Sequence, residues 1–204
     1  MIQLDSALLH NSFRDKFARD LGRAFAPDLG PVAIQAGPDA TEQFFRQCLT
    51  RSERTGFVLQ GEIIKYSFLA VHLGLFFDQD PLFQAIRDDA LWMQPGVHEN
   101  VGLNRLFNST DLMVAEGLAG ADKGFAPGFP EACDAAAQPF GHALDRALDI
   151  CIAANPKRAH ALGEGAMQAA LAAAWRDLDA NHHRFADYPL EWMVCTAFLG
   201  HGFA

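Results

Sequence analysis

The stretch that decides the fold is LQGEIIKYSFLAVHLGLFF, residues 59–77. It is apolar on almost every side, and its charged or imidazole side chains are Glu62, Lys65 and His72. At about 100° per residue these three fall within about 80° of one another, so they would form one narrow polar stripe on a largely buried helix. The apolar run is shorter than the ~20 residues that cross a bilayer. We therefore predict a central core helix and no membrane span.

Helical patterns continue on both sides of this segment. Phe13, Phe17, Leu21 and Phe25 recur every fourth residue with charged residues between them, which is typical of a helix lying on a core. Residues 166–175 are rich in alanine and leucine and have a strong helix preference. No segment shows the two-residue alternation of a strand. The sequence predicts an all-α fold, a bundle of about seven to eight helices.

Turn residues set the approximate limits of the predicted helices. Proline and glycine predict a loop over residues 26–36. A helix is also expected to open the second half, with Pro139 and Gly141 interrupting it. The other predicted helices cover residues 5–25, 38–55, 59–77, 99–118, 156–181 and 188–199, with a short one starting at Pro81.

A cluster of glycine and proline divides the chain into two parts. We predict an N-terminal helical half over 1–118, a Gly/Pro-rich linker over 119–129 and a C-terminal helical half over 130–204. A chain of 204 residues suits one compact unit. The segment 73–77, LGLFF, also matches 199–203, LGHGF, so the halves are candidates for an internal repeat.

Composition restricts the class of partner. Half of the residues are hydrophobic, 17 are phenylalanine, and the net charge is -9. The chain has no run of lysine and arginine, which a nucleic-acid backbone would require, so nucleic acid is not an expected partner. The surplus of phenylalanine would serve a protein-binding surface, and a homo-oligomer is compatible with it.

The cysteines and the first residues indicate the compartment. The four cysteines form no Cys-x-x-Cys pair and have apolar neighbours, so we interpret them as reduced structural residues. Residues 1–6 lack the basic start and the apolar run of a signal peptide. A cytoplasmic protein is expected.

The polar stripe has two interpretations. Glu62, Lys65 and His72 would form a recognition or catalytic patch, or they would mark an exposed helix edge on which Glu62 and Lys65 make an ordinary i,i+3 ion pair. The second interpretation is favoured, because the chain has no phosphate-binding glycine loop, no Gly-x-Ser-x-Gly and no His-Glu-x-x-His. The absence of these motifs favours a non-enzymatic protein.

A metal site is the alternative hypothesis. Asp179, His182 and His183 stand at a predicted helix end, with the spacing at which a carboxylate and imidazoles share an ion. No Glu-x-x-His elsewhere would complete a carboxylate-bridged site, and histidines at a helix C-terminus also complement its dipole. We therefore expect no cofactor.

Two motifs resemble those of a known family. Residues 54–62, RTGFVLQGE, and 73–81, LGLFFDQDP, are similar to a turn and a helix end in small helical proteins encoded in bacterial type VI secretion gene clusters. The matching positions are Gly56, Phe57, Glu62 and the run from 74 to 81, whereas Thr55 stands where that family usually has tyrosine. The resemblance extends over roughly residues 8–90, because residues 12–18, SFRDKFA, resemble the family's first helix.

The resemblance implies a cytoplasmic accessory role without known enzymatic activity. We expect a protein-binding adaptor or chaperone for a secretion-system effector or spike protein. An immunity protein that neutralises a linked toxin is one alternative, and a helical metal-dependent enzyme using Glu62, His72, Asp179, His182 or His183 is another. The stripe and the motif together give the expected binding residues, namely Glu62, Lys65, His72, Phe77, Asp78 and Asp80.

Overall fold

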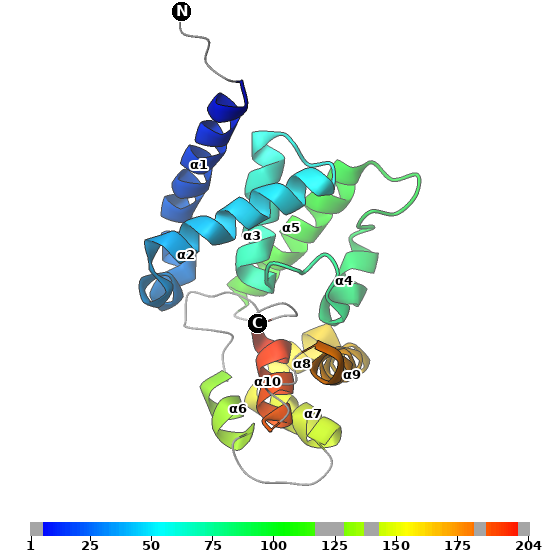
Figure 1. Cartoon of the computed structure of the whole chain (residues 1–204). Coiled ribbons are helices and arrows are strands. Elements are labelled where there is room, and N and C mark those ends of the chain that lie inside the picture. Colours follow the sequence, from blue (N-terminus) through cyan, green and yellow to red (C-terminus); the bar gives the residue numbers. More distant parts are fainter. Residues whose placement is uncertain (1–5, 117–128, 137–142, 182–186, 200–204) are drawn as a thin grey trace, which may run out of the picture.

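The protein is all-helical in the computed structural model, which describes residues 6–116, 129–136, 143–181 and 187–199 (Figure 1). Within these ranges there are ten α-helices, one 3-10 helix and no strand. In chain order they are α1 (Ser6–Ala24), α2 (Ala26–Arg54), α3 (Gln60–Leu73), η1 (Pro81–Phe83), α4 (Gln84–Asp89), α5 (Glu99–Ala115), α6 (Phe129–Ala136), α7 (Ala143–Ala154), α8 (Pro156–Leu162), α9 (Glu164–Asn181) and α10 (Pro189–Leu199).

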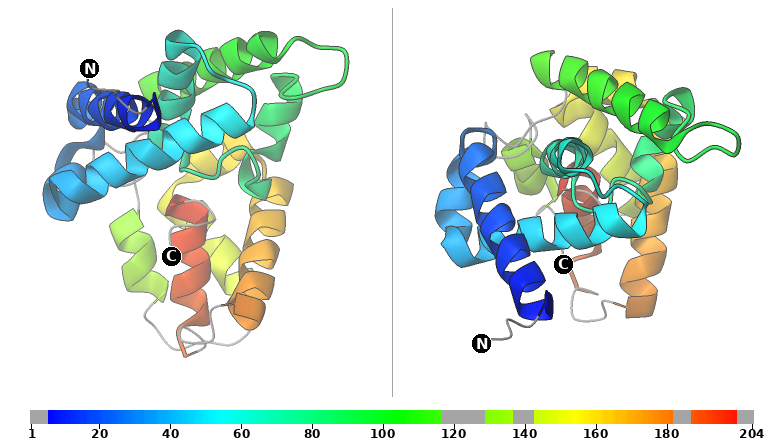
Figure 2. Two further views of the ribbon diagram at one scale, coloured as in Figure 1. Left: turned by 45° about the horizontal axis from the view of Figure 1, so that its top comes forward. Right: turned by 90° about the horizontal axis from the view of Figure 1, so that it is seen from above.

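The helices form two groups that follow one another along the chain (Figures 1 and 2). In the N-terminal group, which holds α1 to α5, α3 packs against both α2 and α5. In the C-terminal group, α10 packs against α6, α7 and α9. The 3-10 helix η1 contacts α9, and the buried apolar side chains of both groups belong to one core. Most of the predicted linker, 119–129, falls outside the described residues.

The central helix α3 is shorter than the predicted 59–77. Tyr66 and Leu69 point into the core and are fully buried. The helix ends where Gly74 takes a φ of 100°, a conformation that residues with a side chain rarely adopt. The remaining residues of the predicted stretch form a turn. Neither α3 nor any other helix in the described ranges has the length and apolar character needed to cross a membrane.

The predicted all-α class is confirmed, but the predicted seven to eight helices are too few. The segment 156–181 forms two helices rather than one, because Gly163 has a φ of 84° and separates α8 from α9. The chain after Asp80 forms the 3-10 turn η1 before α4 begins. A single glycine in one case and a 3-10 turn in the other therefore divide segments that were predicted as one helix.

The first two helices differ from the prediction at two places. Phe13 was expected on the inward face of α1 but is exposed, whereas Phe25 is buried. Residues 26–36 were predicted as a loop but are helical and form the first part of α2. Pro27 is tolerated because it stands in the first helical turn, and Pro31 directly follows Gly30, which with Gly37 is where α2 leaves helical backbone angles.

The suggested repeat places one aromatic residue in the central helix of each group. Tyr66 in α3 and Trp192 in α10 occupy corresponding positions, and both are buried. The end of the second matching segment, residues 200–203, lies outside the described residues. The repeat therefore stays a prediction.

Candidate functional site

The predicted polar stripe of α3 lies along the contact between α3 and α5. Its side chains are partly buried; Glu62 and Lys65 interact with Asn100 and Asn104 of α5, whereas His72 packs against Phe68 of α3. We call this line of contact the α3–α5 seam. It comprises Glu62, Lys65, Phe68 and His72 from α3, and Asn100, Asn104 and Phe107 from α5.

Glu62 closes the N-terminal end of α3. Its Oε2 accepts hydrogen bonds from the backbone N–H groups of Val58 (3.1 Å) and Leu59 (3.0 Å). Such a carboxylate satisfies amides that have no partner within the helix. Burial opposes ionisation of Glu62, but the bonds from Leu59, Asn100 and Val58 outweigh it, so the pKa of Glu62 is lowered. Glu62 is thus held as a carboxylate that orders the preceding turn.

Lys65 pairs with α5. Its Nζ donates a hydrogen bond to Oδ1 of Asn104 and lies 5.9 Å from the centre of the Phe107 ring. Glu62 and Lys65 both belong to the described residues and form no ion pair with each other there, so the suggested i,i+3 pair is wrong. The ammonium group instead links the two helices.

His72 lies in an aromatic row. Its ring is 4.3 Å from that of Phe68, and Phe68 is 4.7 Å from Phe107, both measured between ring centres. Ten residues separate Glu62 from His72 along α3, which is about 15 Å of helix axis. The two groups therefore do not converge on one reacting atom.

Asp78, from the family-like motif, is part of an internal ion pair. Arg51 in α2 donates from Nη2 to Asp78 Oδ1 at 2.6 Å, and both side chains are largely buried. Tyr66 lies beside this pair, and burial together with the charge of Asp78 raises its pKa. The pair anchors the turn after α3 to the end of α2.

Phe77 occupies the core of the N-terminal group. It is buried and packs against Tyr66 (4.9 Å between ring centres) and Trp92 (5.7 Å). Its backbone carbonyl accepts a hydrogen bond from Arg87 Nη1 at 2.6 Å. In this structure Phe77 presents no surface to a partner.

Asp80 stands where the two helical groups meet. Its Oδ1 accepts from the N–H of Leu82 at 2.9 Å and caps η1, while its carbonyl accepts from Arg87 Nη1 at 2.6 Å. Its charge also acts on Arg158 of α8, in the C-terminal group. Asp80 is buried, so its contacts are internal to the molecule.

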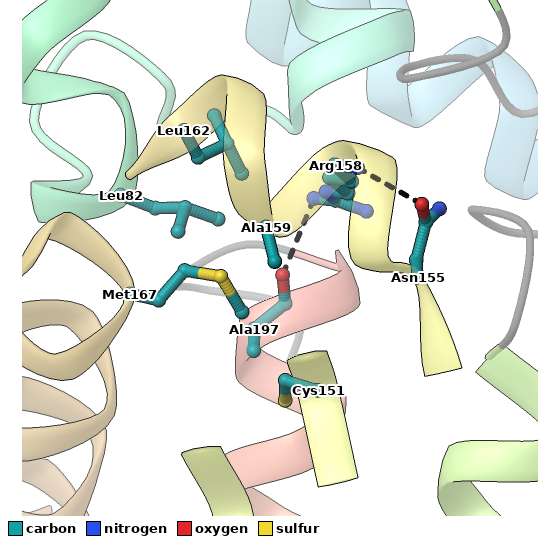
Figure 3. A pocket seen from close by; sticks show the side chains of 8 residues that line it. All are labelled: Leu82, Cys151, Asn155, Arg158, Ala159, Leu162, Met167 and Ala197. Carbon is teal, nitrogen blue, oxygen red and sulfur yellow. Dashed lines mark hydrogen bonds between the residues drawn. The ribbon is translucent and has the colours of Figure 1, made fainter. Parts of the chain in front are cut away.

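A small cavity lies at this junction (Figure 3). Arg158 donates from Nη2 to the carbonyl of Ala197 (3.2 Å), and its backbone N–H donates to Asn155 Oδ1 (3.0 Å). Burial lowers the pKa of Arg158 to about 10. The cavity measures about 10 Å³, the smallest size that accommodates one water molecule and far too small for a substrate. Its lining residues are Leu82, Cys151, Asn155, Arg158, Ala159, Leu162, Met167 and Ala197.

Sequence reasoning missed both buried arginines of this junction. Arginine is rarely buried without a partner, so Arg87 and Arg158 had no reason to be chosen from composition alone. One signal was present, because Arg158 lies in the first turn of a helix that Asn155 and Pro156 begin, two residues after Pro156.

The metal hypothesis is not tested by the structure. His182, His183 and the side chain of Asp179 lie outside the described residues. Among the residues that are described, no three histidine, cysteine or acidic side chains are grouped as a metal ion would require. The hypothesis stays an alternative without a described site.

The positions of the charged and apolar side chains are the main observations from which a function can be inferred. No family model, curated protein or solved structure matches the chain. The resemblance to proteins of type VI secretion gene clusters therefore stays a prediction from residues 8–90. What the chain does is inferred from where its charged and apolar groups lie.

Proposed function

We propose that the chain is a non-enzymatic protein-binding module, an adaptor or chaperone for a secretion-system effector or spike protein. The observation that carries this proposal is the turn before α3. Val58 and Leu59 expose 65% and 63% of their surface, although both are large apolar residues. Both backbone amides are bound by Glu62, so the exposed side chains sit on an ordered turn.

Two further apolar side chains are exposed on the helices that form the seam. Ile64 on α3 and Val101 on α5 are exposed, and Val101 follows Asn100, which bonds to Glu62. We call Val58, Leu59, Ile64 and Val101 the apolar tip. Neighbouring exposed apolar side chains mark contact surfaces, and an ordered turn loses little conformational freedom on binding.

Charge favours a basic partner. The chain carries a net charge of -9, so a positively charged protein surface would be attracted and steered towards it. The type VI resemblance suggests effectors and spike proteins as the first candidates, and the cytoplasm as the place of encounter. Within the proposal, the seam fixes α3 against α5 and the tip makes the contact.

The test measures binding to effector and spike proteins encoded beside the gene. Each is purified and titrated with the wild-type chain and with the double variant Val58→Asp, Leu59→Asp. We expect the double variant to bind at least about tenfold more weakly, as for a central apolar contact. Ile34→Asp is the matched control, because Ile34 is 83% exposed in the first part of α2 and lies outside the tip.

Other outcomes overturn the proposal. If none of these proteins binds, or if Ile34→Asp weakens binding and the double variant does not, the proposed surface is wrong. Rescue of cells from a linked basic toxin would instead support the immunity protein, which the negative charge also fits. Stoichiometric iron, manganese or zinc in protein purified without a His tag would support the metal-dependent enzyme.

A further inference from the structure

Two of the cysteines meet in the fold although they are far apart in the sequence. Cys133 lies on α6 and Cys195 on α10, and these helices pack against each other. Across this contact each thiol is near enough to the other to influence its pKa. Both are partly accessible, whereas Cys48 and Cys151 are buried. The pair is therefore the one place in the described residues where two thiols are both adjacent and within reach of a reagent.

Acidic side chains surround this pair. Glu191 is one helical turn before Cys195 on α10, and its charge acts on both thiols. Asp134, the residue after Cys133, adds a second negative charge close to that thiol. Neighbouring negative charges disfavour the thiolate, so the pair is held in the protonated form.

We propose that Cys133 and Cys195 form a modification site that closes into an intramolecular disulfide on reaction with a small-molecule disulfide such as oxidised glutathione. One cysteine thiolate attacks the reagent, breaks its S–S bond, releases one glutathione thiolate and leaves a mixed disulfide on the protein. The second cysteine thiolate then attacks the protein sulfur of that mixed disulfide and releases the second glutathione. Two protein thiols are oxidised, one reagent disulfide is reduced, and the two protons end on the released glutathione thiolates.

The surroundings set the rates of the two steps. Burial, the adjacent Cys133 sulfur and Glu191 together raise the pKa of Cys195 to about 11, and burial also raises that of Cys133. The first step is therefore slow at neutral pH and accelerates about tenfold per pH unit in the range below the thiol pKa. The second step is fast, because the partner thiol is already in contact.

The experiment uses the full, reduced and folded chain. It is incubated with oxidised glutathione at mildly alkaline pH, quenched with acid, alkylated and mapped by mass spectrometry without reduction. We expect two alkylatable thiols to disappear, a peptide pair joined through Cys133 and Cys195, and no retained glutathione. C133S and C195S should each stop at a glutathione adduct on the remaining cysteine of the pair.

Matched variants separate this chemistry from general oxidation. C48A and C151A should form the Cys133–Cys195 bond as the wild type does. E191Q should react roughly two- to fivefold faster, because removing the charge raises the thiolate fraction more than it lowers nucleophilicity. The proposal fails if folded wild type gives only glutathione adducts, if the bond forms only in denaturant, or if Cys48 or Cys151 is joined instead. None of these results depends on the proposed protein-binding function.

Discussion

Arg51 Nη2 donates to Asp78 Oδ1 at 2.6 Å while its guanidinium lies 4.3 Å from the centre of the Phe76 ring. The ion pair joins the end of α2 to the turn after α3, and both partners are largely buried. Removing one partner of such a pair leaves the other charge without compensation. Asp78→Ala should therefore lower the free energy of unfolding by about 3 kcal/mol, measured by urea denaturation.

The same pair allows an internal control. Arg51→Met keeps a long, flexible side chain at this position and removes the charge that Asp78→Ala would leave unpaired. The double variant should lose clearly less stability than the sum of the two single variants. If the stability losses of the two single variants simply add up in the double variant, the two side chains contribute independently and the proposed ion-pair coupling is wrong.

A second prediction concerns the cap of α3. Glu62→Ala should lower the free energy of unfolding by about 1 kcal/mol, a typical value for a lost cap, and should weaken partner binding by loosening Val58 and Leu59. Glu62→Gln retains one acceptor oxygen but loses the charge. Comparing it with Glu62→Ala therefore distinguishes the contribution of the hydrogen bonds from that of the negative charge. Thermal unfolding and partner titration measure the two effects, and unchanged binding by the Ala variant would contradict the role of the ordered turn.

The charge of Glu62 also predicts a pH dependence. Its pKa is lower in the folded protein than in the unfolded chain, so its stabilising effect is complete above the ordinary glutamate pKa of about 4.3. The effect is lost as the pH falls through the lower folded value. The stability difference between wild type and Glu62→Gln should therefore be constant near neutral pH and shrink in acid, and a difference that grows in acid would contradict the assignment.

Much of the N-terminal group could be predicted from sequence, because its signals are local. The all-round apolar character of residues 59–77 indicates a buried helix, although Gly74 ends that helix before the predicted limit at residue 77. The seam could not be predicted in the same way. Lys65 and its partner Asn104 are 39 residues apart in the sequence. The sequences of α3 and α5 do not indicate which face of one helix packs against which face of the other.

The candidate binding residues illustrate the same limit. The family resemblance predicted Phe77, Asp78 and Asp80 as binding residues, but the structure places Phe77 in the core and each carboxylate near an arginine. Those arginines come from α2, α4 and α8, and their positions depend on the packing of both groups. Charge patterning within a short motif carries no information about such distant partners.

A third prediction separates the two roles of Asp80. Asp80→Asn preserves a side-chain oxygen that accepts from Leu82 but removes the charge facing Arg87 and Arg158. Asp80→Ala removes both. If the charge dominates, the Asn variant should lose nearly as much stability as the Ala variant, about 3–5 kcal/mol, because both remove the carboxylate that acts on the buried Arg158. A stable Asn variant in urea denaturation would show that only the cap matters.

The fourth prediction concerns the two buried thiols. Burial raises the pKa of Cys151 to about 12 and also raises that of Cys48, so neither is a thiolate at neutral pH. In native buffer both should react with a thiol reagent only as fast as the protein opens, and urea should accelerate both strongly. Rapid native labelling of Cys48 or Cys151, identified by peptide mapping, would contradict their burial.

The fifth prediction tests the close contact between α5 and the segment before it. A Cβ on Gly102 would lie 3.0 Å from the Leu91 carbonyl oxygen and 3.1 Å from the Trp92 Cα, both backbone atoms that cannot rotate away. Gly102→Ala should therefore lower the free energy of unfolding by about 1–3 kcal/mol, despite the better helix preference of alanine. Gly61→Ala is the control, because its Cβ would meet no atom within 4 Å and should stabilise α3 slightly.

The position of η1 bears on how the molecule can be divided. Its residue Leu82 precedes the glycine-rich segment in sequence, yet it lines a cavity with Met167 and Ala159 from beyond that segment. A fragment ending at residue 118 would expose the side chain of Leu82 to solvent. It would also remove Arg158, whose charge interacts with Asp80. Such a fragment would recruit a second copy or precipitate. We therefore expect helices from both sides of the glycine-rich stretch to unfold together, because their buried side chains belong to one core.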